Sequence, residues 1–304
     1  MTSSSEVRAL SIGPAAALAL TAGVTLRVHG VFPSAWNLQI EATQDFVSLV
    51  GPGGADLPHA VVLERAEHVR AWSPADGTPV RCDSGTLRVQ AAASEVRIDL
   101  RPAARLPRRT LPSITSLGAA HAACERRLAG LQAAAGTDLR IESLAGAGAP
   151  ATPLGTPLTT AALGLVAAAR TPAALPRAVP SLLGLGPGLT PSGDDLLSGY
   201  LAGTRASSRA ALADALGEAI ERDLSRTTAV SAFLLRCAVR GFWLGPLVDL
   251  AEALAAEREP DALAALGALC ALGHSSGADL ATGFLLGLRT SSCARQGEKR
   301  GRPQ

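Results

Sequence analysis

The residues best suited to chemistry lie in the stretch GLGPGLTPSGDD, at positions 184–195. Four of these residues are glycines, which tolerate positive φ angles and let the backbone approach a ligand closely. An apolar run follows, so we expect the loop to open a helix, whose free amides and dipole attract an anion. The expected ligand is a phosphate or a carboxylate. The expected binding residues in this loop are Gly186, Gly188, Thr190, Ser192 and Gly193.

Two adjacent carboxylates, Asp194 and Asp195, end this stretch. A capping box at a helix start needs one serine and one acid, which Ser192 and Asp195 supply. Asp194 is surplus to capping, and beside an anion it is unfavourable unless it accepts from an ammonium or amide group or binds a metal. We therefore expect catalytic roles for Asp194 and Asp195, orienting an NH₂ group or a general acid/base partner. A structural helix cap is the alternative.

The motif SGDDLLSGYLAG at 192–203 recurs as SGADLATGFLLG at 276–287, with seven of twelve positions identical. Each copy has Ser-Gly-x-Asp, followed by two glycines one helical turn apart, a spacing that permits close helix–helix contact. We expect Ser192 and Ser276 to begin neighbouring helices in a pseudo-symmetric pair. In a chain rich in Gly, Ala and Leu, chance is an alternative source of such a match.

Two further stretches are expected to face the same place. The run RTTAVS at 226–231 sets hydroxyls on one helix face, and GHSSG at 273–277 places a histidine at the second helix start. His274 is the candidate general acid or base. Helix capping and a structural histidine are the simpler alternatives. The expected binding residues here are Arg226, Thr228, Ser231, Ser275, Ser276, Gly277 and Asp279.

Composition excludes several classes of function. A net charge of +2 and only 3% aromatic residues argue against binding to nucleic acid or an anionic membrane. The only lysine is Lys299, which argues against a lysine-dependent phosphate loop, a Schiff base to pyridoxal phosphate, and biotinyl or lipoyl attachment. Any positive charge that the chemistry needs must then come from arginine, a backbone dipole or a metal, and we expect backbone amides with Arg226 to hold an anion.

No histidine or cysteine spacing is typical of a metal site, so we expect neither metal nor cofactor. A metal-dependent enzyme using Asp194, Asp195 and Asp279 is an alternative without a sequence signature. The five cysteines include no C-x-x-C pair, and the chain starts without a secretory signal or a membrane-spanning run. We expect a cytoplasmic protein.

The pattern along the chain predicts an α+β fold, in which a small β-rich N-terminal domain precedes an all-α helical domain. Short β-branched runs indicate strands within 24–110, whereas apolar residues at helical spacing fill 111–290. The proline-rich segment RPAARLPRRTLP links the two. Residues 1–23 are expected to be a separate N-terminal segment and 291–304 a disordered basic tail.

The motifs GLGPGLTPSGDDLLSGYLAG, RTTAVS and GHSSGADLATGFLLG occur in this order, and VHGVFPSAWNL lies near the start. Together they resemble a bacterial family long labelled a domain of unknown function and now named oxamate carbamoyltransferase H-subunit-like proteins. The likeness spans roughly residues 24–290, and its first motif is the most specific. It implies a multi-subunit enzyme of anaerobic allantoin breakdown, which exchanges carbamoyl between oxalurate and phosphate to give oxamate and carbamoyl phosphate.

Two hypotheses of function follow. The first is a subunit of a carbamoyltransferase-type enzyme, which binds carbamoyl phosphate, oxamate or a related small amide or acyl-phosphate at the glycine-rich loop. The second is a non-catalytic subunit that binds a small anion or braces a multi-protein complex. Both imply other subunits as partners, and neither involves nucleic acid or a membrane.

Overall fold

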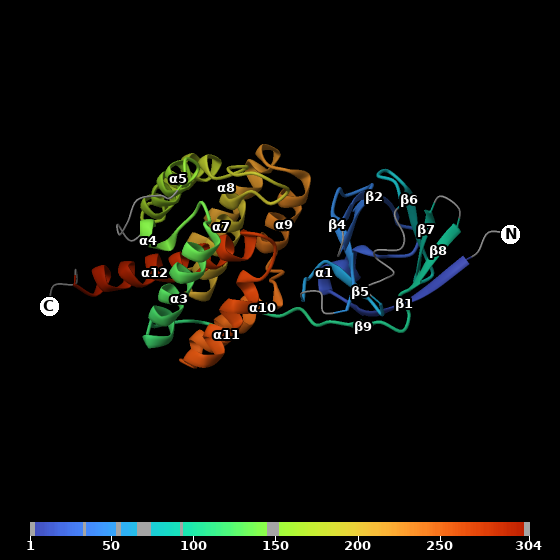
Figure 1. Cartoon of the computed structure of the whole chain (residues 1–304). Coiled ribbons are helices and arrows are strands. Elements are labelled where there is room, and N and C mark those ends of the chain that lie inside the picture. Colours follow the sequence, from blue (N-terminus) through green and yellow to red (C-terminus); the bar gives the residue numbers. More distant parts are fainter. Residues whose placement is uncertain are drawn as a thin grey trace. The chain divides into compact units, whose positions relative to one another are not determined.

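The fold was analysed in a computed structural model, which describes residues 4–32, 35–52, 56–65, 74–91, 94–144 and 152–300. The chain divides into two compact units (Figure 1). The β unit comprises Met1–Arg109 and Phe242–Gly245, and the helical unit comprises Thr110–Gly241 and Pro246–Gln304. A sheet unit followed by a helical unit confirms the predicted α+β class.

The β unit is a single sheet that closes on itself. Within the described residues, its order is β5-β4-β3-β2-β6-β7-β8-β1-β9, and a further pairing of β1 with β5 joins the two sides. Most neighbours are antiparallel, but β1 runs parallel to β8 and β9, and β4 to β5. The strands are β1 (Ser4–Ile12), β2 (Thr25–Phe32), β3 (Ala35–Ile40), β4 (Phe46–Val50), β5 (Ala60–Leu63), β6 (Pro79–Asp83), β7 (Thr86–Ala91), β8 (Ser94–Asp99) and β9 (Ala104–Arg105).

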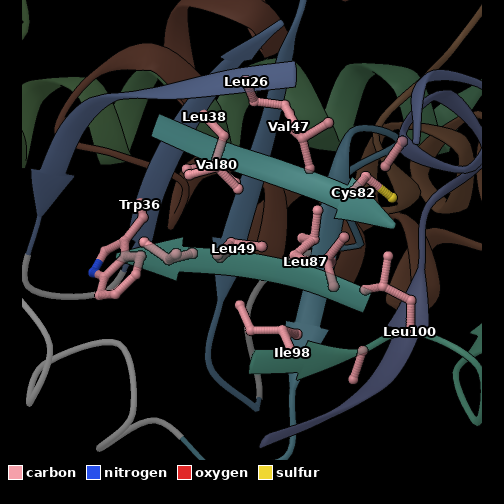
Figure 2. Packing of buried hydrophobic residues seen from close by; sticks show 14 of the residues in the cluster. Leu26, Trp36, Leu38, Val47, Leu49, Val80, Cys82, Leu87, Ile98 and Leu100 are labelled. Carbon is pink, nitrogen blue, oxygen red and sulfur yellow. The ribbon is translucent and has the colours of Figure 1, made fainter. Parts of the chain in front are cut away.

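The core of the β unit lies inside the closed sheet. Alternation of apolar and polar residues in β7 and β8 places Leu87 opposite Ile98 and Val89 opposite Val96, and all four side chains are buried. Figure 2 shows Leu87 and Ile98 with Trp36 and other side chains of the same cluster. The short helix α1 (Pro14–Ala19) adds the buried Ala16 to this core.

Three strands depart from the sequence expectation. The first, β1, lies within residues 1–23, which we expected to be a separate segment, and β9 lies in the proline-rich linker. The third is β3, whose sequence AWNLQI was not predicted as a strand. These strands are held by partners that local patterns do not reveal, since β1 pairs with β5, β8 and β9.

The helical unit contains the helices that the apolar spacing predicted. In the described part of the chain, no helix is both long and apolar enough to cross a membrane. The final helix reaches into 291–300, where we expected a disordered tail, and residues 301–304 lie outside the described residues. The α-helices are α3 (Ala119–Ala135), α4 (Ile141–Leu144), α5 (Gly155–Ala168), α6 (Leu175–Ala178), α7 (Ser192–Ala206), α8 (Ala210–Arg222), α9 (Ala229–Val239), α10 (Gly245–Ala255), α11 (Glu259–Cys270) and α12 (Ser276–Arg300).

Helices α7 and α12, which begin at the two copies of the repeated motif, pack directly against each other. A Cβ atom on Gly199 would lie 1.9 Å from the carbonyl oxygen of Leu280. The equivalent contact is made in reverse, because a Cβ on Gly283 would lie 2.1 Å from the carbonyl oxygen of Leu196. Equivalent positions thus exchange places across the interface, which confirms the predicted pseudo-symmetric pair.

The second pair of glycines fixes the direction of the two helices. A Cβ on Gly203 would lie 2.3 Å from the carbonyl oxygen of Phe284, and one on Gly287 would lie 2.6 Å from that of Tyr200. The contacts therefore advance along both helices in the same direction, so α7 and α12 are parallel. Their N-termini, with Ser192 and Ser276, meet at one end of the pair.

We predict that Gly199→Ala lowers the free energy of unfolding by about 3 kcal/mol or more, because the added methyl group meets backbone that cannot move without separating the helices. The matched control is Gly130→Ala in α3, where a Cβ meets nothing within 4 Å. That change should stabilise the protein by roughly 0.5–1 kcal/mol through helix propensity. Urea unfolding measures both, and equal effects of the two substitutions would contradict the close contact.

Candidate functional site

The loop before α7 contains three glycines with positive φ angles. At two of them a side chain would also clash with the backbone. A Cβ on Gly184 (φ 75°) would lie 2.4 Å from the carbonyl oxygen of Arg226. A Cβ on Gly186 (φ 127°) would lie 2.8 Å from the backbone nitrogen of Ser192. At Gly188 (φ 90°) a Cβ would meet nothing within 4 Å. Packing therefore does not require glycine at position 188, and the positive φ angle alone does.

The same loop presents backbone donors to solvent. Within the described part of the chain, the amides of Gly186, Gly188 and Leu189 donate to no acceptor. Residues 187–189 are exposed, whereas the amides of Gly193, Asp194 and Asp195 in the first turn of α7 donate to the carbonyl oxygens of Leu185 and Pro191. Free amides of a glycine-rich loop that leads into a helix can bind an anion.

Asp194 is buried and fully engaged with protein donors. Its Oδ1 accepts from the amide of Gly184 at 2.9 Å, and its Oδ2 accepts from the hydroxyl of Ser231 at 2.7 Å. The hydroxyl of Thr227, which belongs to the RTTAVS run but is not among the expected binding residues, also donates to Oδ2. Asp194, which helix capping does not require, thus holds the glycine loop against the start of α9.

Hydrogen bonds bring all three motifs together. Thr190 in the loop and Ser276 at the start of α12 join their hydroxyl oxygens at 2.8 Å. The Thr228 hydroxyl donates to the carbonyl of Leu189 and accepts from the amide of Ser231 at 3.1 Å, so it also caps α9. The glycine loop therefore contacts the starts of both α9 and α12.

Two other carboxyl groups at this place have oxygens without a partner among the described residues. Asp195 is 9% exposed and Asp279 1%. Among the described residues, Oδ2 of Asp195 and both oxygens of Asp279 have no hydrogen-bond partner. Burial raises the pKa of Asp195 well above its ordinary value, and the nearby charges of Asp279 and Asp194 add to the rise. Burial also raises the pKa of Asp279, to about 7.

Each of these acids lies beside serines of the helix pair. The Ser276 hydroxyl of α12 is close enough to Asp195 of α7 to oppose the rise of its pKa. In the reverse direction, Ser192 of α7 acts on Asp279, and so does Ser275. At the carboxyl oxygens without partners, these serine hydroxyl groups do not meet the distance and angle of a normal hydrogen bond. Each acid is therefore only loosely held by serine hydroxyl groups at the start of the helix pair.

The other predicted site residues take different places. The side chains of His274 and Arg226 are exposed. Gly193 and Gly277 serve packing, because a Cβ would lie 2.1 Å from the carbonyl oxygen of Leu182 and 1.9 Å from that of Leu269, respectively. No group of three or more His, Cys, Asp or Glu side chains among the described residues is arranged to hold a metal ion.

A pocket of about 490 Å³ lies beside the loop, within the size range of small-molecule sites. It is lined by residues of α5, by Ala178 and Ser181, and by Leu185 of the loop. Its lining is mostly apolar and includes none of the predicted site residues. The carboxyl groups and the pocket are therefore separate features of the helical unit.

We predict that the contribution of Asp279 to the stability of the protein falls as pH rises. The folded protein holds a proton on Asp279 up to about pH 7, whereas an unfolded chain releases it near the ordinary value of 3.8. Between these values the folded state binds more protons, so the stabilisation is complete below 3.8 and is lost as pH rises through 7. Asp195 acts in the same direction.

Asp279→Asn should remove the contribution of Asp279 to this dependence and raise the Tm at about pH 8 by at least about 2 °C, the shift expected of roughly 1 kcal/mol at this size. The control is Asp214→Asn, which changes an exposed carboxylate of α8 and should leave the slope of Tm against pH unaltered. Thermal unfolding followed by circular dichroism measures both. A slope that is the same in Asp279→Asn and wild type would contradict the perturbed carboxyl group.

We predict a structural effect for Asp194→Ala. The substitution leaves one amide and two hydroxyl groups without their acceptor, so the free energy of unfolding should fall by about 3 kcal/mol. Ser231→Ala removes only one of these donors and should cost about 1 kcal/mol. Urea unfolding and protease cleavage of the loop measure the effects, and a fully stable Asp194→Ala protein would refute the fastening role.

Comparison with known protein families covers both units. The family model described as oxamate carbamoyltransferase subunit AllH matches residues 182–288, and the model described as the AllH family N-terminal domain matches residues 8–105. The first match contains the glycine loop, α7, α9 and the start of α12, and the second contains most of the sheet. No solved structure matches the chain. The matches span most of the sequence, so this chain belongs to the AllH family.

Proposed function

We propose that this chain is the subunit of a carbamoyltransferase-type enzyme that binds a small anionic amide substrate at the joined N-termini of α7 and α12. One observation carries the proposal: the buried carboxyl groups of Asp195 and Asp279 have oxygens without partners in the described structure, next to a loop with free amides. Buried polar groups are nearly always hydrogen-bonded, so these oxygens suit a ligand. The family's description as an oxamate carbamoyltransferase subunit supports the choice of ligand.

The chemistry of the site suits oxamate, oxalurate and carbamoyl phosphate. The carboxylate or phosphate of such a ligand would accept from the amides of Gly186, Gly188 and Leu189. Its NH₂ group would donate to a buried carboxylate, for which no other function is apparent. The exposed Arg226 stands at the start of α9 and would add a bidentate cation to the anion site.

The proposed exchange needs positioning and one proton transfer. A phosphate oxygen attacks the carbamoyl carbon of oxalurate, and the bond from that carbon to the amide nitrogen breaks. The nitrogen takes a proton and leaves as oxamate, the phosphate gives up its proton, and carbamoyl phosphate results. Burial favours the neutral form of the Asp195 carboxyl group, which can donate a hydrogen bond to the ligand. Loop amides would stabilise the developing oxyanion.

Gly188→Ala tests the proposal. Alanine disfavours φ near 90°, so the loop should shift and its amides should turn away from the ligand. We expect about tenfold weaker binding of carbamoyl phosphate and oxamate, the equivalent of about 1.4 kcal/mol. Calorimetry on the full chain measures binding, and an assay with the partner subunits measures turnover.

The matched control is Gly77→Ala in the β unit. Gly77 also has a positive φ angle (80°), and a Cβ there also meets nothing within 4 Å. It should suffer the same backbone strain with unchanged binding. If wild type binds neither carbamoyl phosphate, oxamate nor phosphate, alone or with its partners, the chain is a scaffold subunit and the proposal fails.

A further inference from the structure

The two unpartnered carboxyl groups occupy equivalent positions of the repeat. Asp195 and Asp279 each stand three residues after the serine that begins the helix. Each lies beside a serine of the other helix, Asp195 near Ser276 and Asp279 near Ser192. The pseudo-two-fold axis between α7 and α12 therefore relates one acid to the other. A ligand placed on that axis would meet a carboxyl group on each side.

The two copies differ at positions that set the charge of each acid. Ser275 in the second copy corresponds to Pro191 in the first, so Asp279 has a second nearby hydroxyl that Asp195 lacks. Asp194 in the first copy corresponds to Ala278 in the second, so Asp195 alone has a charged neighbour within its own motif. Both differences favour a proton on Asp195 and a charge on Asp279.

Other titratable groups also act on the pair. Asp138 raises the pKa of Asp279, which is nevertheless only about 7, and Cys270 of α11 has its own pKa raised in part by Asp279. Near pH 8, therefore, Asp279 is mostly ionised and accepts hydrogen bonds only, while the raised pKa of Asp195 favours its neutral form, which can donate one.

We propose that Asp195 and Asp279 are specificity-determining residues that recognise opposite ends of one planar two-carbon ligand, with an amide at one end and a carboxylate at the other. This inference rests on the proposed function. Asp279 accepts from the NH₂ group of the ligand, and Asp195 donates its O–H to the carboxylate. A nearly two-fold symmetric ligand thereby binds in one orientation at a nearly two-fold symmetric site.

The same pair rejects the two symmetric relatives of that ligand. Oxalate sets a carboxylate against the charged Asp279, where two like charges repel in a buried place. Oxamide sets an NH₂ donor against the O–H donor of Asp195 and leaves a hydrogen bond unmade. Oxamate satisfies both groups, so the order of affinity should be oxamate above oxalate and oxamide.

Calorimetric titration of the full chain with oxamate, oxalate and oxamide near pH 8 tests the assignment. Asp279→Asn replaces an acceptor by a group that can donate to a carboxylate. It should lower the ratio of oxamate to oxalate affinity at least about tenfold, the equivalent of about 1.4 kcal/mol. Asp195→Asn keeps a neutral donor in place, so the same ratio should change less than about threefold. Ser275→Ala, a milder change, should lower the ratio in the same direction as Asp279→Asn.

The outcomes separate the two proposals. If wild type binds none of the three ligands, with or without partner subunits, the proposed function and this inference both fail. If oxamate binds but Asp195→Asn and Asp279→Asn change the ratio equally, or neither changes it, the proposed function stands and the two acids are only helix caps. Circular dichroism of each variant checks that it is folded before titration.

Discussion

The backbone-to-backbone contact between α7 and α12 is the constraint on which the rest of the helical unit depends. At Gly199 and Gly283 the facing carbonyl oxygen occupies the space that any side chain would need. Because the helices are parallel, their positive ends lie side by side, and their dipoles repel each other while they attract negative charge. Close packing therefore stabilises the helix pair, while its two adjacent positive ends favour a negative charge nearby. The candidate site lies at this N-terminal end of the helix pair.

The three acids at this end divide into two classes by their surroundings. Asp194 receives one amide and two hydroxyl donors, and so holds the glycine loop and α9 against α7. Asp195 and Asp279 are also buried but keep oxygens without partners in the described chain. Only the second class has capacity left for a ligand. The first class supplies the rigidity that keeps the loop amides in place for binding.

The sequence predicted the helix pair because glycine spacing and the Ser-Gly-x-Asp starts are local signals that survive in a single chain. It also predicted the meeting of the loop with Thr228 and Ser276. It assigned Asp194 the need for a ligand, since nothing local reveals that Thr227 and Gly184 supply donors. Strand β1 was missed for the same reason, as its partners lie far along the chain. In both cases the prediction failed because the contacts join residues that lie far apart in the sequence.

The energetic cost of the carboxyl pair is the strongest argument that it serves a ligand. A buried polar group without a hydrogen bond costs about 1–3 kcal/mol, and two apolar or amide side chains at these positions would avoid much of that cost. The nearby hydroxyls of Ser192, Ser275 and Ser276 offset only part of it. Helix capping does not explain the cost, because Thr228 caps α9 with a single hydroxyl and no buried acid. An amide and a carboxylate on one small ligand would complete both groups, with each end matched to the acid of the appropriate charge.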